Sequence, residues 1–258
     1  MTELPLAHRR IVLTRPPGQS DSLAANLRLA GAEVLLHPAI VIAPPADAGA
    51  LREAQAHLAS FDFAAFVSSN AVAHGLAGVP TLPKTLVCLA PGPGTAKALR
   101  AAGATSVLSP AERFDSEGLL ALPELQELAG RRVIIFRGDG GRELLTEGLR
   151  ARGATVELVS CYRRLPPVEE MPALARTLLG TAPDALVITS SEGLDNLLAG
   201  LPKPAAEVLR RTTLFVPHAR IASHARAAGC AKLILTPGAD AGLVAGIVHH
   251  FEDSRTDV

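Results

Sequence analysis

Six short polar segments carry the residue types that bind anions through hydroxyls, guanidinium groups and backbone amides. They are Thr14-Arg15-Pro16-Pro17-Gly18, Ser68-Ser69-Asn70, Gly92-Pro93-Gly94-Thr95, Arg137-Gly138-Asp139-Gly140-Gly141-Arg142, Thr189-Ser190-Ser191-Glu192-Gly193 and His218-Ala219-Arg220-Ile221. Each follows a short apolar run and opens a helical pattern, where unpaired N–H groups and the helix dipole favour negative charge. One such segment alone is most simply a helix cap. Six of them at the carboxyl ends of parallel strands predict a cleft for an anionic ligand.

Tyr162 is the only tyrosine of the chain and lies beside Arg163 and Arg164. A neutral phenol donates a hydrogen bond or a proton without carrying charge itself. The alternative interpretation is a packing residue with a solvated hydroxyl. His218 is open to two interpretations in the same way, as a donor to an anion or as a histidine near a helix cap without a ligand.

The sequence lacks the motifs of several other kinds of site. Gly92-Pro93-Gly94 has neither the third glycine nor the following acidic residue of a dinucleotide fingerprint, and no Walker lysine motif occurs. The eight histidines do not show the spacing of a zinc site. A nucleotide-dependent mechanism is therefore weakly supported, and the histidines do not predict a zinc site.

An internal repeat organises these segments. Arg131–Arg137 restates Arg9–Arg15, and Thr189-Ser190-Ser191 restates Val67-Ser68-Ser69 at the same separation of 122 residues. Pro217–Ala222 corresponds to Pro91–Ala96 at a separation of 126 residues. The second copy is therefore about four residues longer in one loop. Two copies of one α/β unit therefore form the chain, and their strand-end loops can face each other across a cleft.

Short apolar runs alternate with longer helical patterns, which is typical of βαβ units and a parallel sheet. The helical pattern over residues 20–30 has Leu23, Leu27 and Ala30 on one face. Gly31, Gly103, Gly153 and Gly229 follow helical patterns where a C-cap requires a left-handed residue. We predict ten strands, five for each copy, over residues 10–14, 33–36, 63–67, 86–89, 106–108, 132–136, 155–159, 185–189, 213–216 and 232–235.

Two extended, proline-rich segments, residues 37–46 and 161–168, each follow the second strand of a copy. We interpret them as paired linker strands between two similar domains, each with a parallel five-stranded sheet flanked by helices. Residues 1–38 with 169–258 would form one domain and residues 42–160 the other, so each copy is divided between both. Two consecutive domains that meet near Gly130 remain an alternative on periodicity alone.

Composition limits the class of protein. The formal net charge is zero and aromatic residues make up only 3%, so neither a nucleic-acid nor a membrane partner is expected. Cys88, Cys161 and Cys230 share no CxxC spacing and are expected to be buried, reduced thiols of a cytoplasmic protein. The first ten residues lack the apolar core of a signal peptide, and no apolar run has the length of a membrane helix.

The order and spacing of these motifs resemble the uroporphyrinogen-III synthase family over nearly the whole chain. The segments that carry the resemblance are Leu13-Thr14-Arg15-Pro16, Phe66-Val67-Ser68-Ser69-Asn70-Ala71-Val72, Gly92-Pro93-Gly94-Thr95-Ala96, Arg137-Gly138 with Gly141-Arg142, Cys161-Tyr162-Arg163-Arg164, Ile188-Thr189-Ser190-Ser191-Glu192-Gly193-Leu194 and His218-Ala219-Arg220-Ile221-Ala222. No single motif is specific. Pro91 and Ala219 depart from the family's usual pattern, which leaves the role of those two turns open.

The resemblance implies a cytoplasmic lyase of tetrapyrrole and haem biosynthesis, built as two α/β domains on a two-stranded linker. Its substrate would be hydroxymethylbilane, a linear tetrapyrrole with acetate and propionate carboxylates. The enzyme would close the ring with inversion of the last pyrrole, through a spiro intermediate and with loss of water. No cofactor or metal is implied, and we expect a monomer that binds only this small molecule.

The resemblance also assigns roles to residues by position. Tyr162 matches the linker tyrosine that would assist departure of the hydroxyl. Positions that would bind carboxylates are matched by Ser69, Ser190, Ser191, His218, Ala219 and Arg220. From the same turns we add Arg15, Ser68, Asn70, Gly94, Thr95, Arg137, Gly138, Thr189 and Ile221 as substrate-binding candidates.

Two other functions fit parts of the pattern. A cytosolic binding module for an anionic metabolite would need the same turns but no proton donor. A nucleotide-using α/β enzyme would need the phosphate fingerprints that are missing.

Overall fold

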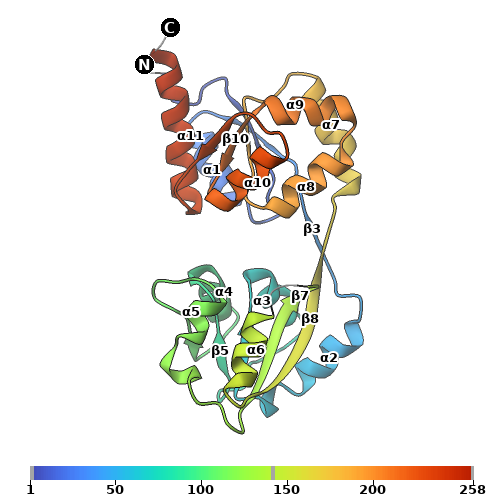
Figure 1. The fold of residues 1–258 in the computed structure, drawn as a ribbon, viewed down its shortest axis with the longest axis vertical. Coiled ribbons are helices and arrows are strands. Elements are labelled where there is room, and N and C mark those ends of the chain that lie inside the picture. The colour runs from blue at the N-terminus through green and yellow to red at the C-terminus, as the bar shows by residue number, and fades with distance from the viewer. Residues whose placement is uncertain (1–2, 141–142, 257–258) are drawn as a thin grey trace. The chain divides into compact units, whose positions relative to one another are not determined.

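The computed structural model of the chain describes residues 3–140 and 143–256. The chain divides into two compact units, one with the residues up to Val41 and from Leu165 on, and the other with Ile42–Arg164. Both divisions fall inside the proline-rich segments at residues 37–46 and 161–168. The chain passes between the units twice, along β3 (Val41–Ala43) and along β8 (Thr155–Leu165) (Figure 1).

The first unit contains a five-stranded sheet in the order β11-β10-β9-β1-β2, in which every neighbouring pair is parallel. Its elements are β1 (Arg10–Leu13), α1 (Asp21–Leu29), β2 (Glu33–Leu36), the 3-10 helix η3 (Val168–Glu170), α7 (Met171–Leu179), β9 (Ala185–Val187), α8 (Ser191–Gly200), α9 (Lys203–Arg211), β10 (Thr213–Val216), α10 (Ala219–Ala227), β11 (Leu233–Leu235) and α11 (Ala239–Thr256).

The second unit repeats this strand order as β6-β5-β4-β7-β8 and adds β3 beside β8. Its other elements are α2 (Ala48–Ala56), η1 (Leu58–Ser60), β4 (Phe63–Phe66), α3 (Ser69–Gly75), β5 (Val87–Leu89), α4 (Pro93–Ala101), β6 (Val107–Leu108), α5 (Ser116–Leu120), η2 (Pro123–Leu125), β7 (Arg132–Gly138) and α6 (Leu144–Ala151).

The prediction of five parallel strands holds for the first sheet and is wrong for the second. The sheet of the second unit has six strands, because the segment predicted as a linker strand pairs along β3 with β8 and so belongs to this sheet. The chain follows β3 into this unit and β8 out of it, so the added pair is antiparallel and the sheet is mixed. All ten predicted strands are present, and β8 extends six residues further than predicted, to Leu165.

Each sheet is buried on both faces, as an open parallel sheet requires. In the first unit α1 and α11 cover one face, where Ile11 and Leu13 point, and α7 to α10 cover the other, where Val12 points. In the second unit α5 and α6 lie on the face of Val133 and Ile135, and α2 to α4 on the face of Ile134 and Phe136. Within each unit the chain therefore forms three layers, helices, sheet and helices (Figure 1).

The repeat is preserved down to single hydrogen bonds. Asp184 accepts from the Arg10 backbone N–H at 2.8 Å and from the Arg9 guanidinium at 3.0 Å. Asp62 accepts from the Arg132 backbone N–H at 2.8 Å and from the Arg131 guanidinium at 2.8 Å. The predicted C-cap glycines also match, since Gly31, Gly103, Gly153 and Gly229 all have positive φ angles between 88° and 102°. Glycine adopts this backbone conformation without steric cost.

Candidate active site

In the second unit, four neighbouring strands bring their predicted site residues to one edge. Strands β5, β4, β7 and β8 are adjacent and parallel, so their carboxyl ends lie together. Gly94 and Thr95 follow β5, and Ser68, Ser69 and Asn70 follow β4. The last two residues of β7 are Arg137 and Gly138, and Tyr162 lies on β8 directly beside Gly138.

Ser68 and Tyr162 are joined by a hydrogen bond, although 94 residues separate them in sequence. The two hydroxyl oxygens are 3.2 Å apart, and either atom can be the donor. The Ser68 Oγ also accepts the backbone N–H of Ala71 at 3.1 Å, which makes Ser68 the N-cap of α3. Tyr162 is only 4% exposed and belongs to the apolar core of its unit, with its ring tilted against that of His74 at 5.9 Å. The phenol is therefore held at a fixed place on the strand-end edge.

A β-bulge and a glycine fix the ring of Tyr162. Arg137 pairs with Ser160 and Gly138 pairs with Tyr162, so β8 has one extra residue, Cys161, at this point. Bulges near functional sites often redirect a side chain. The ring of Tyr162 then lies against Gly138, because a Cβ at position 138 would come within 2.8 Å of Cε2 and Cζ. The sequence contained no signal for this contact, since Gly138 fits a strand-end turn equally well.

The N-terminus of α4 supplies backbone donors at the same edge. Gly92 is its N-cap in an extended conformation, Pro93 opens the helix, and the first bond back to the cap comes from the Ala96 N–H at 3.0 Å. A helix offers its first N–H groups no acceptor of its own, so the amides of Gly94 and Thr95 are available to a ligand. Gly94 is exposed, whereas Thr95 is only 7% exposed and its side chain contributes mainly to packing.

Arg137 is already neutralised within its own turn. Its guanidinium donates to the Glu143 carboxylate at 2.9 Å and to the Gly140 carbonyl at 3.1 Å. It borders a pocket of about 170 Å³ that is also lined by Val67, Ser116 and Thr146 among others. Ser116 and Thr146 were not among the predicted site residues, and no sequence motif marked them. Gly141 and Arg142, which belong to the same predicted turn, lie outside the described residues.

The first unit has the equivalent edge, formed by the carboxyl ends of β10, β9 and β1. Ser190 caps α8 by accepting the Gly193 N–H at 3.3 Å, as Ser68 caps α3 through Ala71. Thr189, Ser190 and Ser191 are all half-buried. The position that corresponds to Tyr162 in the repeat is Ile40, which is buried. Only the edge of the second unit therefore carries a phenol.

The turn after β10 is the most open cationic part of this edge. His218 is the N-cap of α10 without a side-chain cap bond, and His218, Ala219 and Arg220 are all exposed. The structure gives the Arg220 guanidinium no carboxylate partner among the described residues. Ile221 is 3% exposed, so its side chain packs in the core.

Arg15, by contrast, is paired. Its guanidinium donates to the Asp240 carboxylate of α11 at 2.6 Å, and both side chains are mostly buried. Within the described part of the chain, Arg220 is therefore the predicted arginine whose charge is left for an added anion. Binding by the predicted residues stays a prediction.

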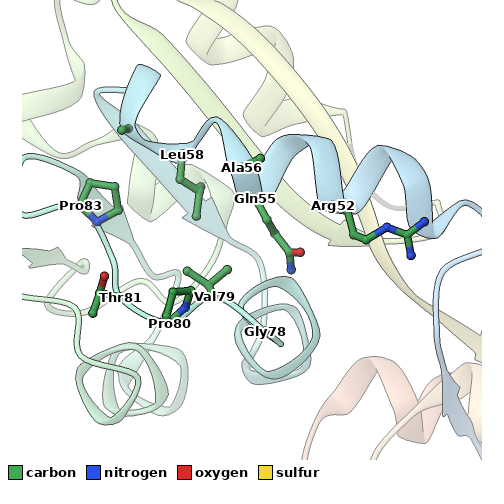
Figure 2. A pocket seen from close by; sticks show the side chains of 10 residues that line it. Arg52, Gln55, Ala56, Leu58, Gly78, Val79, Pro80, Thr81 and Pro83 are labelled. Carbon is green, nitrogen blue, oxygen red and sulfur yellow. The ribbon is translucent and has the colours of Figure 1, made fainter.

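Pockets also occur away from these edges. Figure 2 shows one of about 360 Å³ between α2 and the segment from Gly78 to Pro83, with Gln55 pointing toward that segment. The Gln55 amide donates to the carbonyls of Gly75 at 2.9 Å and Ala77 at 3.1 Å, and so connects α2 to the chain just before that segment. This pocket lies where β4 and β5 begin, at the opposite edge of the sheet from Ser68 and Gly94.

Within residues 3–140 and 143–256, no helix is both long and apolar enough to cross a membrane. The same residues contain no group of three or more His, Cys, Asp or Glu side chains arranged to hold a metal ion. The three cysteines are buried and unpaired, and burial raises the pKa of each thiol, to about 11 for Cys88 and about 12 for Cys161.

Both units thus fall in the class of open, mostly parallel α/β sheets, in which ligands bind at the carboxyl ends of the strands. A sequence model described as uroporphyrinogen-III synthase HemD matches residues 21–242. The chain is 34% identical over 238 residues to a uroporphyrinogen-III synthase from Salmonella typhimurium, which covers 89% of this chain and 96% of that protein. A uroporphyrinogen-III synthase from Escherichia coli is 33% identical with the same coverage.

A solved structure of a mutant uroporphyrinogen III synthase from the thermophilic bacterium Thermus thermophilus has the same fold. It matches with a TM-score of 0.60 at 21% identity, over 95% of this chain and 99% of that one. The chain belongs to the uroporphyrinogen-III synthase family. The resemblance inferred from the motifs is confirmed.

Proposed function

We propose that this enzyme cyclises linear hydroxymethylbilane to uroporphyrinogen III, inverting the terminal pyrrole ring and releasing water. It is then a cyclising hydro-lyase of tetrapyrrole and haem biosynthesis. The observation that carries the proposal is the place of Tyr162. A single phenol is fixed by a hydrogen bond to Ser68 at the strand-end edge, beside turns suited to carboxylates.

The first chemical step requires a mild proton donor. The electron-rich pyrrole expels its hydroxymethyl oxygen as the C–O bond breaks, and the Tyr162 phenol gives its proton to that oxygen so that water leaves. The terminal pyrrole then attacks through its substituted α-carbon and forms a spiro intermediate, whose rearrangement inverts the ring. The phenol regains a proton when the rearranged pyrrole loses one.

The larger task is geometric, because the flexible chain must present the substituted carbon and not the free one. Holding reactants in a near-attack arrangement lowers a barrier by up to about 7–11 kcal/mol in favourable cases. We assign this hold to the amides at the N-termini of α4, α8 and α10, the hydroxyls of Ser69 and Ser191, and Arg220. These groups bind the substrate's acetate and propionate carboxylates by charge-assisted hydrogen bonds.

We further infer that the two compact units are the two domains of the enzyme, with β3 and β8 as their connection. The buried, unpaired thiols support a reducing cytoplasm as its location. The proposed reaction needs no cofactor or metal, and we expect a monomer with no nucleic-acid or membrane partner.

The test is the isomer formed from hydroxymethylbilane. Purified protein is expected to yield the type III isomer, whereas spontaneous closure yields type I. Exclusive type I product would refute the proposed activity. If the bilane were instead bound tightly and recovered unchanged, the protein would be a binding module for an anionic metabolite.

A further inference from the structure

The Ser68 hydroxyl can form a further hydrogen bond besides the one that caps helix α3. A serine hydroxyl donates one hydrogen and accepts at two lone pairs. One lone pair of Oγ is used by the Ala71 N–H at 3.1 Å, which leaves the hydrogen and one lone pair for the Tyr162 oxygen at 3.2 Å. Ser68 is therefore able to donate to the phenol or to accept from it without losing the cap.

The repeat shows that capping alone does not explain this contact. Ser190 caps α8 through Gly193 in the same way as Ser68 caps α3 through Ala71. The residue of the first unit that corresponds to Tyr162 is Ile40, which has no polar side-chain atom. The chain thus contains two equivalent capping serines, and only one of them can contact a phenol.

The Tyr162 hydroxyl depends on Ser68 for its side-chain hydrogen bond. The ring is almost fully buried, lies against Gly138 on one side and has the His74 ring at 5.9 Å. A buried tyrosine hydroxyl ordinarily needs a hydrogen-bond partner. Among residues 3–140 and 143–256, the side chain that meets this need is Ser68.

We propose that Ser68 is a positioning residue for Tyr162, and that it donates its hydroxyl hydrogen to the phenol oxygen while the phenol gives its own proton away. This inference rests on the proposed function, because it assigns the phenol proton to the departing substrate hydroxyl. As the O–H bond of Tyr162 breaks, negative charge develops on its oxygen, and the Ser68 O–H stabilises that charge. Ser68 keeps its own hydrogen throughout, and the Ala71 N–H continues to bond to its Oγ.

The orientation of the pair matters for the direction of proton transfer. If Tyr162 donates to Ser68, the phenol hydrogen is occupied and points away from substrate. If Ser68 donates to Tyr162, the phenol hydrogen is left for the leaving oxygen. Substrate binding should therefore switch the pair to the second arrangement.

The composition of the chain allows a direct spectroscopic test. Tyr162 is the only tyrosine and there is no tryptophan, so the tyrosine doublet in an ultraviolet Raman spectrum reports this phenol alone. The intensity ratio of the doublet depends on whether the phenol oxygen donates or accepts a hydrogen bond. Ser68→Ala should change the ratio. Ser190→Ala removes the equivalent cap in the first unit and should leave the ratio as in the wild type.

Turnover supplies the second measurement. Ser68→Ala should lower kcat about two- to tenfold with a smaller change in KM, since one hydrogen bond to the reacting group is lost. Ser68→Thr retains a hydroxyl and should restore most of the rate. Asp47→Ala removes the cap of α2 in the same unit, where Asp47 accepts from Gly49 at 2.8 Å, and should leave kcat near the wild-type value. Thermal denaturation of each variant checks that it is folded.

The double variant shows whether Ser68 acts through the phenol. In a Tyr162→Phe background, Ser68→Ala should slow turnover no further, because the group on which Ser68 acts is gone. Additive losses, or a Raman ratio unchanged in Ser68→Ala, would overturn the proposal. If the wild-type protein forms no type III isomer, the proposed function fails, and the Raman comparison still decides whether Ser68 holds the phenol.

Discussion

Gly138 lies against the ring of Tyr162 so closely that no other residue fits between the β7 backbone and the phenol. A Cβ at position 138 would come within 2.8 Å of Cε2 and Cζ and 3.2 Å of the hydroxyl oxygen. The absence of a side chain on one strand thus fixes the position of a functional group on the next. A substitution at Gly138 changes this contact and removes no hydrogen-bonding side chain.

Gly138→Ala should therefore displace the phenol from Ser68. We expect turnover to fall at least as much as in Tyr162→Phe, and the free energy of unfolding to fall by about 1–3 kcal/mol from overpacking. Urea denaturation and the isomer assay measure the two effects. Gly94→Ala serves as the stability control, because a Cβ there meets no atom within 4 Å. Wild-type turnover in Gly138→Ala would show that the ring position does not matter.

Tyr162→Phe removes the phenol hydroxyl and keeps the buried ring. Turnover should fall several-fold or more, since the leaving hydroxyl loses its proton donor. The free energy of unfolding should fall by about 0.5–1.5 kcal/mol, the usual net contribution of one hydrogen bond. Steady-state kinetics and thermal denaturation separate the two. A variant with the wild-type rate would rule out the donor role and leave Tyr162 as a packing residue.

The three predicted arginines should contribute unequally to substrate binding. Arg220→Gln should raise KM about two- to fivefold, as expected for an exposed ion pair with a carboxylate. Arg226→Gln, near the other end of α10, is the matched control and should leave KM unchanged. Equal KM values for the two variants would contradict a binding role for Arg220.

Asp240 gives a complementary prediction, because its carboxylate forms an ion pair with the Arg15 guanidinium at 2.6 Å. Asp240→Asn removes this competing charge and should lower KM, since Arg15 becomes available to a substrate carboxylate. Stability should fall by about 1–3 kcal/mol, because the mostly buried Arg15 guanidinium loses its charge partner. An unchanged KM, with the protein folded, would indicate that Arg15 does not meet the substrate.

Burial of Cys88 predicts a loss of stability in alkali. Its pKa rises from 9.0 to about 11 in the folded protein, so the native state holds the thiol proton where the unfolded state releases it. The stability that the raised pKa of Cys88 contributes is fully present below pH 9. It falls as the pH rises towards 11, by about 1.4 kcal/mol for each pH unit. Urea unfolding of wild type and Cys88→Ala across this range should show curves that are parallel below pH 9 and converge above it. Curves that stay parallel throughout would refute the linkage.

The sequence was sufficient for the strands and helices but not for the contacts that form the site. The runs 33–36 and 213–216 locate β2 and β10 to the residue, because short apolar segments between helical patterns are typical of the strands of a parallel sheet. The turns after β4, β5, β9 and β10 follow from the same pattern. Position in the repeat even relates Ser68 to Ser190.

Contacts between distant residues were not predictable in this way. The bulge at Cys161, the Ser68–Tyr162 hydrogen bond and the Arg15–Asp240 ion pair depend on register and side-chain packing across many residues. No local pattern records them. Residues 37–46 were predicted as a linker strand, but the sequence did not show that β3 joins the sheet of the second unit, since this depends on its pairing with β8.

The shared strand order of the two sheets has a consequence for how such a chain can originate. Apart from β3, each sequence copy places its first two strands in one unit and its last three in the other. This is the arrangement produced when two identical half-length chains exchange halves and are afterwards joined end to end. In such an exchanged dimer, position 40 and position 162 would be the same position of one sequence. In a single chain the two positions can differ, and here position 40 is a buried isoleucine while position 162 is the only tyrosine.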